Sequence, residues 1–176
     1  MNLGLLVLRV VVGLLLAGHG AQKLFGWYGG HGLRGTAAFF DQIGLRPGRI
    51  HATAAGLMEF AGGLLVALGL LTSIGAMLLI AVMTAAVITV HAPKGPWVTN
   101  GGYEYNLVIA ATAFALAGIG AGAWSLDHAL SLNVHGVLWA IGALVVGLVG
   151  GTGAVISGRL QARRDRPAAT QRPTTA

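Results

Sequence analysis

Five long apolar stretches limit what this chain of 176 residues can fold into. They run over residues 3–25, 52–71, 73–92, 104–120 and 134–156, and each approaches or exceeds the ~20 apolar residues that a helix needs to cross a bilayer. Because lipid cannot hydrogen-bond exposed backbone groups, such stretches form helices. The sequence therefore predicts an all-α, polytopic membrane helix bundle with the lipid bilayer as its first partner.

The composition excludes several other classes of protein. Charged residues make up only 9% of the chain, against about 25% in a soluble domain, so a soluble enzyme or a disordered chain is not expected. The net charge is +6, but five of the eleven Lys and Arg lie beyond residue 158, in a basic tail after apolar sequence. Such a tail is typical of membrane orientation, so no nucleic-acid partner is expected. The absence of cysteine excludes disulfides and thiolate metal sites.

The basic residues predict an orientation. With five crossings, loop 26–51, loop 93–103 and the tail lie on one side, and all Lys and Arg except Arg9 lie in or beside these segments. Such residues favour the cytoplasmic side. We therefore expect a multi-pass protein of the bacterial plasma (inner) membrane, with its N-terminus outside and its C-terminus in the cytoplasm. Arg9 interrupts the first stretch, which we interpret as a mature helix and not as a signal peptide.

Shorter segments lead to local predictions. Residues 36–43 are expected to form an interfacial helix capped by Thr36 and ended by Gly44. Arg9, near the outer end of its helix, is expected to snorkel outward or to meet Asp127. Gly147 and Gly151 form a small-residue pair typical of helix packing. Residues 30–35 match a GxGxxG pattern, but the strand and the acidic residue of a dinucleotide site are missing.

Ionisable residues inside the apolar stretches are the most informative feature for function, because they are costly in a membrane. His19 and Lys23 are four residues apart and share a helix face. Glu59 lies at a similar depth, and Gly56 and Gly63 beside it mark a packing face that points into the bundle. We expect His19 to approach Glu59, directly or through one water. With the residues at nearby helix ends, the candidate cluster in one leaflet comprises His19, Gln22, Lys23, Glu59, His91, Glu104 and Tyr105.

Several segments resemble the DoxX family of small bacterial membrane proteins: residues 18–27 (GHGAQKLFGW), 35–40 (GTAAFF), Glu59 with Gly62 and Gly63, 89–91 (TVH) and 101–105 (GGYEY). The resemblance covers roughly residues 4–122. It implies a four-helix membrane domain over residues 1–122 and a quinone-linked redox role, because the family name comes from a subunit of a thiosulfate:quinone oxidoreductase. To this core the chain adds a connection and fifth helix over residues 123–158 and a basic tail, expected to be disordered, over 159–176.

Two functions of different classes fit these residues. In the first, the protein is a membrane subunit of a quinone-linked oxidoreductase and works with a redox partner protein. A quinone-sized pocket in the cytoplasmic leaflet would then bind quinone through His19, Gln22, Lys23, Glu59 and Tyr105 and relay protons through His19, Glu59, His91 and Glu104.

In the second, the protein is a non-catalytic membrane adaptor or anchor for partner proteins, and the polar cluster only fixes the helix register. Enzymatic activity and a homo-oligomer are both left open by the sequence. A proton-coupled carrier is weaker, because no half-helix repeats are present. Haem on His19 and His91 is disfavoured by their different depths, and no metal is expected.

Overall fold

The computed structural model describes residues 2–165, which form helices and connections with no strand among them. The long helices are α1 (Asn2–Phe25), α3 (Gly48–Leu68), α4 (Thr72–Ala86), α5 (Glu104–Ile119) and α7 (Val137–Arg164). The shorter ones are η1 (Trp27–Gly29), α2 (Gly32–Gln42), η2 (Val87–His91), η3 (Ala92–Lys94), η4 (Val98–Asn100) and α6 (Leu126–Ala129). The predicted all-α bundle is confirmed.

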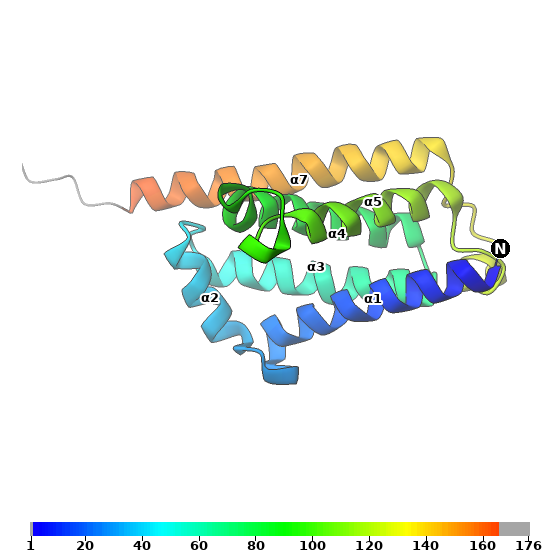
Figure 1. Cartoon of the computed structure of the whole chain (residues 1–176), viewed down its shortest axis with the longest axis horizontal. Helices are drawn as coiled ribbons and strands as arrows, with labels where there is room; N and C mark the ends of the chain where they lie inside the picture. The colour runs from blue at the N-terminus through cyan, green and yellow to red at the C-terminus, as the bar shows by residue number, and fades with distance from the viewer. Residues whose placement is uncertain (1, 166–176) are drawn as a thin grey trace, which may run out of the picture.

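The five long helices run side by side, and α2 lies across one end of them (Figure 1). We call this end, which also holds loop 92–103 and the end of α7, the α2 end. The opposite end, with the N-terminus, the α3–α4 turn and α6, is the α6 end. Within residues 2–165, every Lys and Arg except Arg9 lies on an element at the α2 end, in line with five crossings.

Glycines set the close crossing of α1 and α3. A Cβ on Gly13 or Gly20 of α1 would overlap the backbone of α3, and a Cβ on Gly63 would overlap the backbone of α1. Small residues let membrane helices approach in this way. The crossing fixes which face of α3 points inward, and the prediction that Glu59 lies on that face is confirmed by its burial.

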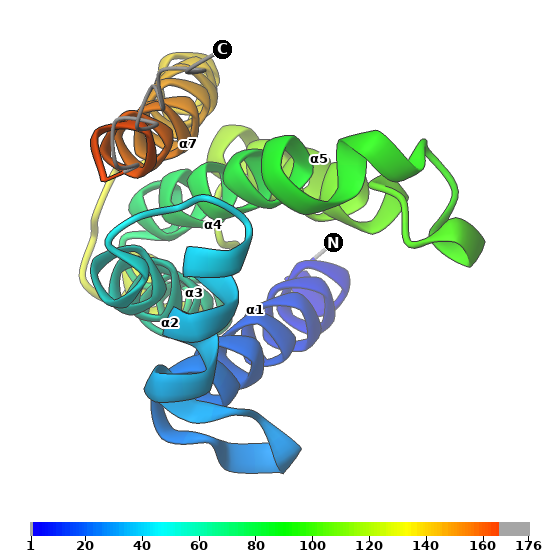
Figure 2. The same ribbon diagram turned by 90° about the vertical axis from the view of Figure 1, so that its left-hand side faces the viewer.

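Helix α4 lies in the middle of the bundle, between α3, α5 and α7 (Figure 2). Its Leu79 and Ile80 are almost completely buried. A Cβ on Gly147 of α7 would overlap Ile80, and one on Gly151 would overlap the Ala81 carbonyl. The predicted packing role of this glycine pair is confirmed, and α7 is an integral wall of the bundle.

By length and composition, four helices could cross a membrane: Asn2–Phe25, Gly48–Leu68, Thr72–Lys94 (α4 with η2 and η3) and Val137–Arg164. The fifth, Glu104–Ile119, is shorter, at 16 residues. At 1.5 Å per residue it spans about 24 Å, slightly less than a typical hydrocarbon core. Only Gly69, Leu70 and Leu71 separate α3 from α4, so these two helices form a tight antiparallel hairpin.

Two local predictions are wrong. Thr36 does not cap α2, which begins at Gly32, and its hydroxyl instead donates to the Gly32 carbonyl at 2.8 Å inside the helix. The tail does not begin at Arg159, because α7 continues to Arg164. Gly158 lies inside α7 and packs against Leu45 and His51. The arginines that follow it lie at the C-terminus of the helix, where positive charge interacts favourably with the helix dipole. The rest of the predicted tail, residues 166–176, lies outside the described residues.

Candidate functional site

A cavity of about 290 Å³ lies near the α2 end of the bundle. It is bordered by α1, α2, α3, α7 and the continuous segment of α4 and η2, and Phe39 and Phe40 of α2 help to enclose it. Most of its lining side chains are apolar. Those with polar groups are Lys23, His51, Glu59, Thr89 and His91. An apolar pocket with a few convergent polar groups is the usual form of a small-molecule site.

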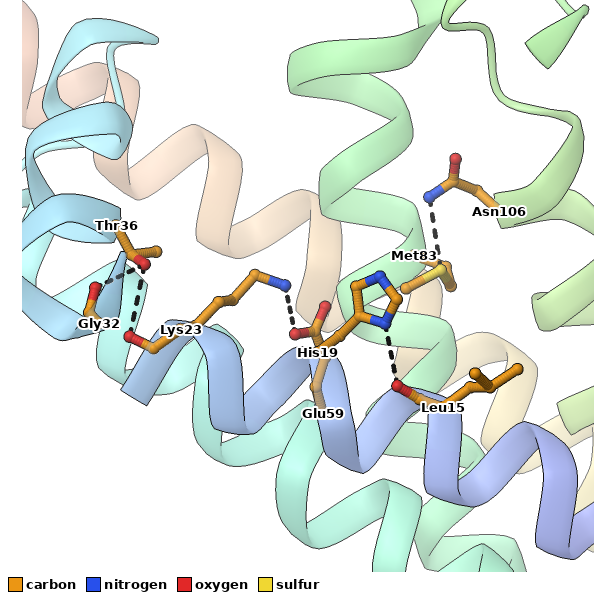
Figure 3. Close-up of polar contacts among 8 residues, drawn as sticks. All are labelled: Leu15, His19, Lys23, Gly32, Thr36, Glu59, Met83 and Asn106. Carbon is orange, nitrogen blue, oxygen red and sulfur yellow. Dashed lines mark hydrogen bonds and ion pairs between the residues drawn. The ribbon is translucent and has the colours of Figure 1, made fainter. Parts of the chain in front are cut away.

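An ion pair lies at the border of this cavity. Lys23 of α1 donates through Nζ to Oε2 of Glu59 on α3 (Figure 3). Only 4% of the Glu59 side chain is exposed, against 25% for Lys23. A buried carboxylate is costly unless it is paired, and the close α1–α3 crossing brings Lys23 near enough to provide that pairing.

His91 ends the π-helical turn η2 and lines the same cavity. Its Nδ1 lies 2.7 Å from the Gly101 carbonyl oxygen. Because a carbonyl oxygen can only accept a hydrogen bond, the neutral ring carries its proton on Nδ1, and Nε2 is left as an acceptor. The cavity therefore combines a cation, a carboxylate and an imidazole acceptor.

His19 does not join this group. Its side chain is exposed on α1, and its Nδ1 lies 2.9 Å from the Leu15 carbonyl of the same helix (Figure 3). The direct partner of Glu59 is Lys23, and no direct hydrogen bond joins Glu59 to the predicted His19 within residues 2–165. The reason is the face that α1 presents to α3, which is set by Gly13, Ala17 and Gly20. His19 lies beside that face, and only the longer lysine side chain reaches across.

Three other predicted residues also lie outside the cavity lining. Gln22 donates to the Tyr28 carbonyl at 3.2 Å and lines a separate hollow between α1 and α2. Glu104 is the first residue of α5, and its backbone N–H donates to the Pro96 carbonyl at 2.9 Å. The side chain of Tyr105 is 62% exposed. Of the predicted cluster, the structure therefore brings Lys23, Glu59 and His91 to one cavity.

Two parts of this site were missed from the sequence. One is His51, which lies in the first turn of α3 because this helix begins at Gly48 and not at the predicted residue 52. Its spacing of eight residues from Glu59 would have placed both on one helix face. The other is the wall formed by α7, whose lining residues are Gly150, Gly151, Ala154 and Val155.

A second group of charges lies at the α6 end. Arg9 is only 1% exposed, so the prediction that it snorkels outward is wrong. It donates from Nη1 to the Ala67 carbonyl at 2.7 Å and from Nη2 to the Trp124 carbonyl. Asp127, the other predicted partner, forms no ion pair with it within residues 2–165. Its carboxylate instead accepts from the N–H groups of Leu71 and Thr72 and from the Thr72 hydroxyl.

Neither group resembles a metal site. Among residues 2–165, no three His, Cys, Asp or Glu side chains come together in a way that could hold a metal ion.

Comparisons with known proteins agree with the resemblance in the sequence. Residues 4–92 match the DoxX family. A protein of Bacillus subtilis (strain 168) named "Putative oxidoreductase CatD" is 35% identical over 117 residues, which cover 66% of this chain and 81% of that protein. No solved structure matches the chain. The family match includes Lys23, Glu59 and His91 and ends before α5 and α7.

Proposed function

The chain belongs to the DoxX family of membrane proteins, and from this premise we propose that it is a membrane subunit of a quinone-linked oxidoreductase. The observation that carries the proposal is the apolar cavity among membrane helices with Lys23, Glu59 and His91 at its border. The oxidoreductase name of the Bacillus subtilis relative supports a redox role.

The groups at the cavity fit a quinone headgroup chemically. Such a headgroup carries two oxygen atoms that accept hydrogen bonds in the oxidised form and donate them in the reduced form. Lys23 Nζ can donate to a carbonyl oxygen, and His91 Nε2 can accept from a hydroxyl. The volume of about 290 Å³ is near the lower limit of about 300–1,000 Å³ for ligand pockets, which suits a single ring.

Each residue has a separate proposed role. A quinone carries two electrons and two protons within the membrane, and a redox partner protein would exchange the electrons. Lys23 orients the headgroup and neutralises Glu59. The Glu59 carboxylate and His91 Nε2 can each accept a proton that the reduced headgroup releases. Phe39 and Phe40 keep bulk water from the cavity.

A titration with a soluble short-chain quinone in nanodiscs tests this proposal. The parent protein should bind, and Glu59→Gln should weaken binding about tenfold, equivalent to about 1.4 kcal/mol, because it removes the partner of Lys23. Glu104→Gln is the matched control, since Glu104 lies outside the cavity lining, and it should bind like the parent. Absent binding, or equal binding in parent and Glu59→Gln, would favour a non-catalytic adaptor instead.

We also propose that the α2 end faces the cytoplasm in the inner membrane of a bacterium. The support is the gathering of Lys and Arg at this end together with the preference of such residues for the cytoplasmic side. A reporter that is active only in the cytoplasm, fused after Ala176, should be active. A reporter at this position that is active only in the periplasm would reverse the orientation.

A further inference from the structure

The two sides of the cavity differ in chemistry. Lys23, Glu59 and His91 come from α1, α3 and η2, whereas the wall supplied by α7 consists of glycine, alanine and valine. A ligand that fills this cavity should therefore be polar on one side and apolar on the other. The water-facing end is covered by α2, so the apolar part of the ligand needs another way out.

The packing of α7 leaves an edge of the cavity uncovered. Helix α7 packs along α4 and touches α3 at only a few positions, and the two lie apart in the end-on view (Figure 2). Gly151 is pressed against Ala81, but its neighbour Gly150 is exposed, and a Cβ there would come no closer than 4.0 Å, to the Ala81 Cβ. Ala154, one turn further on, is also exposed while lining the cavity.

This edge faces hydrocarbon, because α3 and α7 are both membrane-spanning by length and composition. The cavity of about 290 Å³ accommodates a ring-sized headgroup but is too small to enclose a long hydrocarbon tail as well. Gly150, which has no side chain, and the small side chains of Ala154 on α7 and Ala54 on α3 leave room for such a tail between the two helices.

We infer that the ligand is a quinone with a long isoprenoid tail, and that the tail passes from the cavity into the bilayer between α3 and α7, beside Gly150 and Ala154. This inference rests on the proposed function and adds the class of quinone and the path of its tail. It gives α7, which lies outside the family match over residues 4–92, a direct part in ligand binding.

The test compares a long-tailed quinone with its tail-less ring analogue in nanodiscs of one lipid composition. Gly150→Leu places a bulky side chain at the uncovered edge. Gly153→Leu is the matched control, because it is the same exchange in the same helix at an exposed position where a Cβ meets nothing within 4 Å. Ala154→Leu is a second variant that adds bulk to the edge without replacing a glycine. Each variant is first checked for parent-like helicity and a single oligomeric state.

In the parent and in Gly153→Leu, the tail should strengthen binding over the ring analogue. In Gly150→Leu and Ala154→Leu this gain should fall about tenfold, while binding of the ring analogue stays within about twofold of the parent. An unchanged gain in both edge variants would overturn the tail path and leave the proposed function standing. Failure of the parent to bind either compound would overturn both.

Discussion

The two ends of the bundle both bury charged side chains, yet they use them in opposite ways. At the α6 end, Arg9 and Asp127 bond to backbone groups of α3, of the α3–α4 turn with the start of α4, and of the segment before α6. At the α2 end, Lys23 and Glu59 bond to each other beside a cavity. A charged side chain whose hydrogen bonds go to backbone groups stabilises the fold. A charged pair that borders a cavity can still interact with a ligand.

At the α6 end, the groups around Arg9 and Asp127 are closely packed. The Asp127 carboxylate accepts from the first N–H groups of α4, where the helix dipole favours negative charge. Gly69, in the left-handed conformation with φ of 62°, lies so close to the Arg9 guanidinium that a Cβ would overlap it. The Ser73 hydroxyl donates to the Val134 carbonyl at 2.5 Å and ties α4 to the start of α7.

The largest predicted effect concerns Arg9. Arg9→Met should lower the free energy of unfolding by about 3–5 kcal/mol, because it removes two hydrogen bonds from a charged group and leaves the Ala67 and Trp124 carbonyls without their donor. Arg34→Met is the matched control on the exposed side of α2 and should change stability by less than about 0.5 kcal/mol. Denaturant unfolding in mixed micelles measures both. Equal stability of the two variants would mean that the α6-end network does not hold the bundle together.

The sequence was sufficient to predict the membrane bundle, because span length, helix hydropathy and the position of basic residues are local properties. It was also sufficient for the inward face of Glu59, since Gly56 and Gly63 flank that residue at helical spacing. These predictions succeeded because the bilayer leaves a chain few alternatives.

Other features depend on contacts that no local pattern contains. Arg9 turns inward because its acceptors are the carbonyls of Ala67, on the neighbouring helix α3, and of Trp124, in the distant connection before α6. Helix α3 begins at Gly48, whose N–H is bound by the Asp41 carboxylate at 2.8 Å, whereas hydropathy marks where a helix enters lipid and not where it starts. Because α3 starts before the predicted residue 52, hydropathy did not place His51 on this helix.

A smaller effect on stability is predicted for the double variant Lys23→Met, Glu59→Met. Removing both charges together should leave the free energy of unfolding within about 1 kcal/mol of the parent, because the cost of burying the pair disappears with its attraction. Lys23→Met alone should be clearly destabilising, since it leaves Glu59 uncompensated. The double variant should also lose quinone binding. If the double variant were as unstable as Arg9→Met, the Lys23–Glu59 pair would stabilise the fold as the α6-end network does, and the two ends of the bundle would not differ.

A local effect is predicted at Thr36, where donating a hydrogen bond and capping a helix make opposite demands on the side chain. Its hydroxyl donates to the Gly32 carbonyl at 2.8 Å within α2, whereas a capping side chain would accept from a backbone N–H. Thr36→Ser keeps a donor and should leave α2 unchanged. Thr36→Asp would be tolerated at a cap, but as an ionised carboxylate it cannot donate, so it should weaken α2 by about 0.5–1.5 kcal/mol. Faster hydrogen exchange of the α2 amides in Thr36→Asp, and parent-like exchange in Thr36→Ser, is the expected result. Parent-like protection in the aspartate variant would restore the capping interpretation.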